Sequence, residues 1–189
     1  MKTAELEQIL EGGTETRKHE FKNSIPWNVK SFVRAIFAMS NLKEGGYIIV
    51  GIDNDLNRIG VSESIKNTYI LETMKDQINS FADPKVDFSI SITLDKEGKE
   101  YIIIKIFEFE EVPVLCKKDS YETNQGTLYY RNSNRRPESA PISNSTDMRE
   151  IIELAAIKKM KKITSIINEL GVKETFEDKE KLNEELEGL

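Results

Sequence analysis

The chain has 189 residues, a formal net charge of −6 and 38% apolar residues, which is ordinary for a soluble globular protein with one domain and a small appendage. Its one cysteine, Cys116, and one histidine, His19, exclude an internal disulfide and a zinc site with the usual number of His and Cys ligands. No apolar run approaches transmembrane length, and the first residues lack the apolar region of a signal peptide. We therefore expect a cytoplasmic protein without membrane contact.

Charge is unevenly distributed along the chain. Residues 173–189 contain three Lys against seven Asp and Glu, so this segment contributes −4 and the rest carries −2 (−6 minus −4). A negative net charge argues against a general nucleic-acid binder. Three basic clusters nevertheless stand out: Arg17, Lys18 and Lys22; Arg131, Arg135 and Arg136; Lys158, Lys159, Lys161 and Lys162. Each is either a phosphate-contacting patch or an ordinary solvated face.

The apolar periodicity predicts a mixture of helices and strands. Helices are expected over residues 4–10, 27–41, 64–81 and from 145 or 146 onward. Strands are expected within 45–53 and over 18–22, 57–61, 86–94, 101–107, 113–116 and 127–131, followed by a loop over 132–143. We therefore predict one α+β domain over residues 1–143, with a mixed sheet and packed helices. A C-terminal helical extension with an acidic tail follows over 144–189.

The apolar strand within 45–55 ends in acidic residues, Asp53 and Asp55. Because side chains alternate along a strand, Tyr47, Ile49, Gly51 and Asp53 are expected to share one face. Ligands often bind where a buried strand ends, which makes Asp53 a candidate site residue. The alternative is a loop cap, since Asp and Asn favour turns by bonding their own backbone.

Two further carboxylates precede this strand. Glu20 and Lys22 are expected to point to one side of the strand over 18–22, with Phe21 in the core. Together with Glu15 and Asp53, Glu20 would supply the oxygen ligands that Mg²⁺ or Mn²⁺ prefers. Lys22 could stabilise a phosphate beside such a metal, so the pattern is compatible with metal-dependent phosphodiester chemistry.

The order of these elements resembles the Schlafen-type AlbA-like domain over about residues 5–143. The motifs that carry the resemblance are Glu15-Thr16, Glu20-Phe21-Lys22 with Ser24, Ala38-Met39-Ser40-Asn41, the run from Gly45 to Asp53, Gly60, Pro113, and Thr127 to Asn132 with its Tyr-x-Arg pattern. The resemblance implies an α+β fold and a role on DNA or structured RNA. One branch of the family cuts tRNA-like RNA. By resemblance to that branch, Glu15, Glu20 and Asp53 of this chain would be the catalytic carboxylates, with Lys22 beside them.

Three functions follow from the sequence and the resemblance. The first is a nucleic-acid-binding module with phosphate contacts from Arg17, Lys18, Lys30, Arg34, Arg131, Arg135 and Arg136. The second is an endoribonuclease that holds Mg²⁺ or Mn²⁺ at Glu15, Glu20 and Asp53 and forms a homodimer to supply a second lobe. The third is a protein-interaction domain that uses its acidic tail. No ATP is expected, because the chain lacks a Gly-x-x-x-x-Gly-Lys-Ser/Thr loop.

Overall fold

The computed structural model describes residues 1–120, 122–132 and 137–169. Its helices are α1 (Thr3–Glu11), α2 (Val29–Ser40), α3 (Glu63–Lys66), α4 (Leu71–Asn79) and α5 (Ser145–Glu169). Its strands are β1 (His19–Lys22), β2 (Gly46–Val50), β3 (Ala82–Asp83), β4 (Phe88–Leu94), β5 (Glu100–Ile106), β6 (Leu115–Cys116), β7 (Tyr129–Arg131) and β8 (Ser139–Pro141). This mixture of helices and strands confirms the predicted α+β class.

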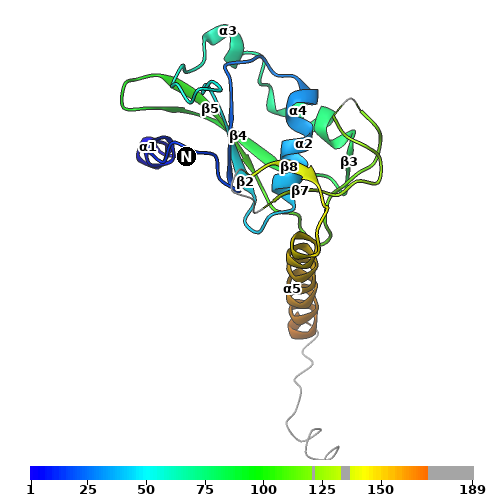
Figure 1. Ribbon diagram of the computed structural model, residues 1–189. Helices are drawn as coiled ribbons and strands as arrows, with labels where there is room; N and C mark the ends of the chain where they lie inside the picture. The colour runs from blue at the N-terminus through cyan, green and yellow to red at the C-terminus, as the bar shows by residue number, and fades with distance from the viewer. Residues whose placement is uncertain (121, 133–136, 170–189) are drawn as a thin grey trace, which may run out of the picture.

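A four-stranded sheet in the order β1-β2-β5-β4 forms the centre of the domain. β1 pairs with β2 in parallel and the other pairs are antiparallel, so the sheet is mixed as predicted. The isoleucine-rich alternation of β2 and β5 gives each strand two apolar faces. One face, with Ile48 and Ile104, belongs to the main core, and the other, with Ile49 and Ile103, packs against Leu6 of α1. Accordingly, α1 and α2 lie on opposite sides of the sheet (Figure 1).

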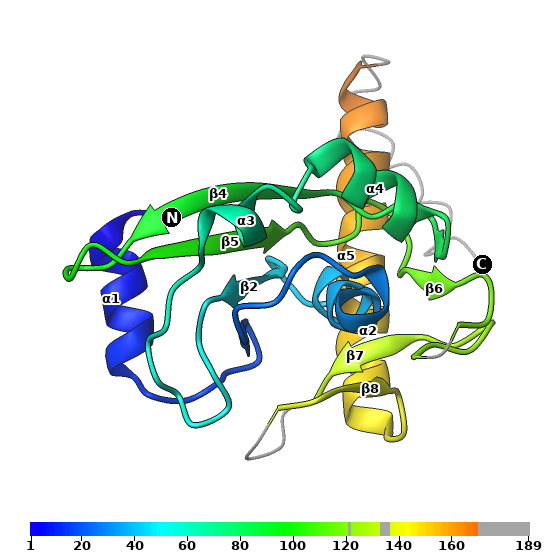
Figure 2. The same cartoon turned by 90° about the horizontal axis from the view of Figure 1, so that it is seen from above.

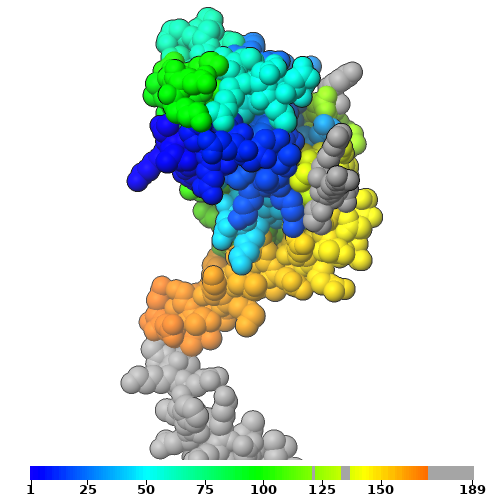
Figure 3. Space-filling view, turned by 60° about the vertical axis from the view of Figure 1, so that its left-hand side comes forward, coloured from blue at the N-terminus to red at the C-terminus, as the bar shows by residue number. Residues whose placement is uncertain are grey.

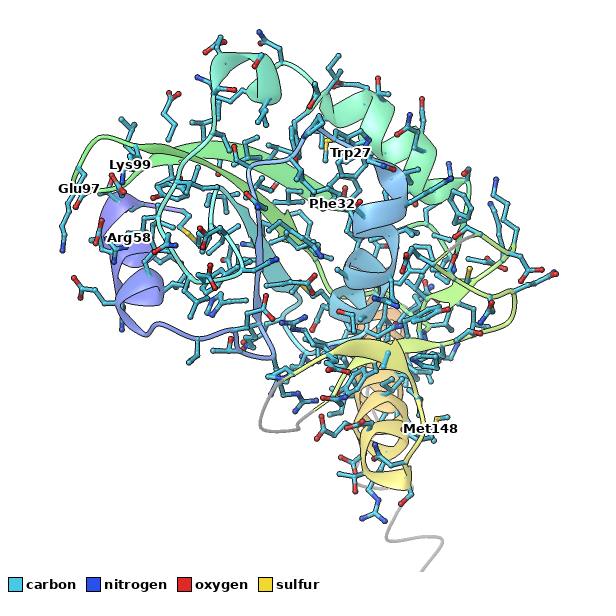
Figure 4. All side chains as sticks on the ribbon, turned by 45° about the horizontal axis from the view of Figure 1, so that its top comes forward. Trp27, Phe32, Arg58, Glu97, Lys99 and Met148 are labelled. Carbon is cyan, nitrogen blue, oxygen red and sulfur yellow. The ribbon has the colours of Figure 1, made fainter. Side chains whose placement is uncertain are left out.

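Helix α2 is the central element of the main core. Asn28 caps its start by accepting a hydrogen bond from the Lys30 backbone, and the residues from Ala35 to Ser40 are all buried. Trp27, just before the helix, stacks on Phe32 with ring centroids 4.9 Å apart (Figure 4). Figure 2 shows α2 surrounded by the large sheet, α4 and the small β7–β8 sheet.

Buried Asn41, at the end of α2, ties the small sheets to the core. Its amide donates to the backbone carbonyls of Val114 and Tyr129 at 3.0 and 2.9 Å, and its carbonyl accepts from the Val114 N–H at 2.8 Å. A single buried side chain therefore satisfies backbone groups at Val114 and Tyr129, both more than 70 residues after Asn41 in the sequence.

Helix α5 contributes apolar side chains to the main core through its first half only. Ile151 and Leu154 enter the main core, whereas every residue from 159 to 169 is exposed. The far end of the helix stands clear of the domain (Figures 1 and 3). None of the described helices has both the length and the apolar character needed to cross a membrane.

Three expected elements differ from the structure. The helix expected over 64–81 is broken into α3 and α4, because Thr68 accepts from the Trp27 N–H and the Tyr69 hydroxyl donates to the Ile25 carbonyl. The return strand expected over 57–61 is reduced to one bridge between Ile52 and Arg58. The loop expected over 132–143 contains β8, which pairs with β7. In the first and third cases contacts with other segments override the local pattern.

Candidate functional site

A polar cleft of about 720 Å³ opens beside β1, the first turns of α2 and β8. Its charged lining residues are Lys22, Lys30, Arg34 and Arg131 together with Glu15, Glu20, Glu122 and Glu138. Asn54, which follows β2, also reaches this cleft, whereas Asp53 is not among its lining residues. The cleft thus gathers most of the predicted site residues but leaves out one predicted metal ligand.

Arg131, at the end of β7, lies beneath this cleft with a side chain only 1% exposed. Its Nε donates to the Thr16 carbonyl at 3.0 Å, and its Nη2 donates to the His19 carbonyl at 3.1 Å and to Glu15 at 3.2 Å. Its Nη1 donates to Glu20 and to the Ser139 hydroxyl. All five N–H donors of the guanidinium therefore have an acceptor.

The two glutamates on either side of Arg131 are themselves held by other groups. Glu15 accepts from the Phe21 N–H at 2.7 Å, which folds residues 15–21 around the guanidinium. Glu20 is 8% exposed and also accepts from the Ser139 hydroxyl at 3.2 Å and pairs with Lys22 at 2.8 Å. Opposite charges and hydrogen bonds thus compensate the cost of burying this arginine and its partners.

This arrangement corrects the sequence-based assignment of Arg131 as a phosphate contact. The strand places Arg131 on the same inward side as Tyr129, which is 2% exposed. Its positive charge is neutralised by ion pairs with Glu15 and Glu20. Arg131 is therefore a buried structural cation of the cleft floor and is not positioned to contact a phosphate.

Asp53 closes a turn instead of joining the other two carboxylates. Its Oδ1 accepts from the Asp55 and Asn57 N–H groups at 2.9 and 2.8 Å, and its Oδ2 accepts from the Asn57 amide at 2.9 Å. The Asn57 side chain, followed by its backbone N–H, holds the pKa of Asp53 below its ordinary value. Of the two sequence interpretations of Asp53, these contacts match the loop cap.

The residues present do not fit the Mg²⁺ or Mn²⁺ site that the resemblance implies. Within residues 1–120, 122–132 and 137–169, no group of three or more His, Cys, Asp or Glu side chains is arranged to hold a metal ion. Glu15 and Glu20 face the guanidinium of Arg131, and Asp53 is occupied by its own turn. The expected three-carboxylate centre is therefore not assembled in this conformation.

Lys30 and Arg34 are the cleft cations best placed to meet a ligand. They lie one turn apart on α2, and both line the cleft. Lys30 is exposed and its ammonium makes no ion pair within the part of the chain that the structure describes. Arg34 is 48% exposed and pairs with Glu122 at 3.4 Å, an exposed pair of the kind that contributes little to stability. Both side chains can therefore exchange their present surroundings for a ligand.

Residues 15–138, well over half of the chain, match the family described as Schlafen, AlbA_2. The chain belongs to this family. The match confirms the resemblance and includes the cleft residues from Glu15 to Glu138.

Two solved structures share the fold of this Schlafen AlbA_2 domain. The DIP2311 protein from Corynebacterium diphtheriae is 18% identical with a TM-score of 0.50, and the match covers 78% of this chain but only 27% of that one. The N-terminal domain of a protein from Nitrosomonas europaea, named as related to the ATP-dependent DNA helicase RecG, is 16% identical with a TM-score of 0.50. That match covers 77% of this chain and 97% of the domain. The comparison with curated proteins gave no match.

Arg17 and Lys18 of the Schlafen AlbA_2 domain lie outside the cleft, beside α5. Arg17 donates to Glu150 at 2.7 Å and to the Tyr130 hydroxyl at 2.9 Å, and Tyr130 donates to the same Glu150 oxygen at 2.7 Å. The hydrogen bond from Arg17, followed by that from Tyr130, holds the pKa of Glu150 below its ordinary value. Lys18 pairs with Glu44. Arg17 thus fastens α5 to the domain, and the phosphate contacts predicted for Arg17 and Lys18 would be on a different surface from the cleft.

Arg135 and Arg136 fall outside the described residues, so their predicted phosphate contacts stay predictions. Sequence reasoning missed Ser139 and Asn54 as members of the cleft. It also missed the structural role of Arg131, although a signal was present. Because side chains alternate along a strand, the strand expected over 127–131 places Arg131 on the same side as Tyr129. An arginine that points into the protein requires carboxylate partners.

Proposed function

We propose that this Schlafen AlbA_2 domain binds nucleic acid by its phosphate backbone, with Lys30 and Arg34 as the principal contacts and Lys22 beside them. The observation that carries the proposal is the placement of these cations in one cleft of the family domain, with Lys30 unpaired among the described residues. Phosphate contacts fix a nucleic acid in position without reading its sequence. The domain therefore binds DNA or RNA with little sequence preference.

The charge distribution of the cleft supports binding by a few contacts instead of a broad basic surface. Glu15 and Glu20 are neutralised by Arg131 and Lys22, so they repel a phosphate less than free carboxylates would. Lys30 and the loosely paired Arg34 remain at the mouth. With a whole-chain charge of −6, affinity is modest and strongly reduced by salt. The helicase-related name of the Nitrosomonas europaea protein is consistent with this role by analogy of fold alone.

The test is fluorescence anisotropy with labelled single-stranded RNA, single-stranded DNA and duplex DNA over a range of salt concentrations. Lys30→Ala/Arg34→Ala should weaken binding to all sequences alike and reduce the slope of log K against log salt by about 0.7 to 0.9 per lost contact. A matched control is Lys96→Ala/Lys99→Ala in the turn between β4 and β5, neither of which lines the cleft. Figure 4 shows Lys99 far from the start of α2 at Trp27 and Phe32.

The control removes the same two positive charges without changing the cleft. It therefore distinguishes the effect of lost cleft contacts on affinity from the effect of a more negative net charge. Unchanged affinity and slope in the cleft variant would refute the proposal. Equal losses in both variants would also refute it, because they would indicate an effect of overall charge alone.

The endoribonuclease remains an untested prediction, and no contact in the cleft favours it over binding. The carboxylates that the family resemblance assigns to catalysis are engaged by Arg131 and by the turn at Asp53. The protein-interaction function assigned to the acidic tail rests on residues 173–189, which lie outside the described part of the chain. The expected homodimer does not depend on the cleft, and the surface that bears on it is helix α5.

A further inference from the structure

Helix α5 has two different apolar sides, and the domain uses only one of them. Ile151 and Leu154 are buried against the domain, and the stem of Lys158 continues this side. The Lys158 ammonium lies 2.6 Å from Glu108 and above the ring of Phe109. These contacts fix which side of the helix faces the domain.

The second side carries an apolar stripe made of Ile152, Ala156, Met160, Ile163 and Ile167. Four of its members are large side chains with exposed fractions of 58% for Ile152, 67% for Met160, 45% for Ile163 and 40% for Ile167. At about 100° per residue, the stripe occupies an arc of about 80°, centred roughly 170° from the docked side. No described residue covers it, and large contiguous apolar patches on a soluble protein usually mark an interaction surface.

The spacing of the stripe indicates what kind of partner covers it. Its members follow one another at intervals of four, four, three and four residues, and the last three intervals have the spacing at which helices pair in coiled coils. The charges on the same helix agree with this: Lys158 and Lys162 turn to the domain side, where they pair with Glu108 and Glu111. Among the described residues, one charged side chain borders each long edge of the stripe: Lys159 on one side and Glu153 on the other.

An apolar stripe with few charges at its edges is self-complementary. The same patch on a second chain can pack against it across a two-fold axis, as symmetric dimers require. A partner selected by charge would instead need several charged groups along the stripe, whereas Lys158 and Lys162 are paired on the domain side and only Glu153 and Lys159 flank it among the described residues.

We propose that α5 pairs with α5 of a second copy of this chain through the stripe Ile152, Ala156, Met160, Ile163 and Ile167. The stripe faces away from the docked side, so two domains lie on opposite outer sides of the helix pair. Each dimer then presents two clefts. This pairing does not depend on nucleic acid.

The test is sedimentation velocity of the full chain without nucleic acid, at concentrations from about 1 to 100 µM, where dimers of ordinary affinity form. The wild type should be a dimer. Met160→Glu/Ile163→Glu should raise the dimer dissociation constant by about 100-fold or more, because pairing would bury unpaired carboxylates. The matched control, Lys161→Gln/Ser165→Glu, makes the same charge change on the other side of α5 and should leave the dimer intact.

Both variants alter exposed positions, so circular dichroism and the melting temperature of the full chain should show that each one folds. A wild type that stays monomeric at every concentration would overturn the proposal, including the case in which residues 170–189 of the same chain cover the stripe. Self-association that persists in Met160→Glu/Ile163→Glu would overturn it as well.

Discussion

Replacing Arg131 by Met tests whether this arginine is the structural cation of the cleft floor. The substitution removes five hydrogen bonds and leaves Glu20, which is 8% exposed, without its main counter-charge. Removing one partner of a buried ion pair typically costs about 3–5 kcal/mol. For a domain of this size, each kcal/mol lowers the melting temperature by about 2–4 °C. We therefore expect a free energy of unfolding lower by about 3–5 kcal/mol, measured by urea denaturation.

Two companion variants make this measurement decisive. Arg34→Met removes an arginine from the mouth of the same cleft, where its pair with Glu122 is exposed, and should cost less than about 1 kcal/mol. Glu20→Gln in the Arg131→Met background removes the stranded charge and should restore part of the loss, since replacing both partners is less costly than removing one. If Arg131→Met were no more destabilising than Arg34→Met, Arg131 would not have the structural role derived from its contacts.

The remaining predictions concern the core, the docking of α5 and the metal. Asn41→Leu should lower the free energy of unfolding by about 3 kcal/mol or more, because it leaves three buried backbone groups without partners; urea denaturation measures this. Because the folded-state pKa of Glu150 is depressed by Arg17, its contribution to stability is present above the unfolded pKa and is lost as pH falls through the folded pKa. Denaturation midpoints from pH 7 to pH 3 should therefore fall less steeply in Glu150→Gln than in wild type. Adding Mn²⁺ and then EDTA should leave the melting temperature unchanged and produce no cleavage of labelled tRNA, whereas a metal-dependent rise of several degrees would contradict the geometry of the carboxylates.

The sequence predicted most of the fold because its strongest signals are periodic. The stripe along α2 and the alternation and isoleucine density of β4 and β5 depend only on local spacing, and the structure confirms these elements. The break between α3 and α4 was not predictable in this way. It depends on hydrogen bonds that Thr68 and Tyr69 make with the segment before α2, more than 40 residues earlier in the chain.

The candidate site was predicted as a set of residues but not as an arrangement. Glu15, Glu20, Lys22, Lys30 and Arg34 do line one cleft. Sequence spacing could not show that a buried arginine from β7, more than 100 residues away, lies between the two glutamates. Nor could spacing decide whether Asp53 caps a turn or binds a metal ion, since both roles use the same carboxylate.

The position of Arg131 also determines what the cleft would have to do to accept a metal ion. An ion shared by Glu15 and Glu20 would have to displace a guanidinium whose five N–H donors are all satisfied, and that guanidinium is buried and would lose its acceptors. Recruiting Asp53 as a third ligand would in addition break three hydrogen bonds in the turn to Asn57. Binding a phosphate at Lys30 and Arg34 requires neither change, because one cation is unpaired among the described residues and the other is held by a single exposed contact. Phosphate binding therefore requires no rearrangement of the cleft. Metal-dependent cleavage requires the hydrogen bonds of Arg131 and Asp53 to be broken and the carboxylates to be repositioned.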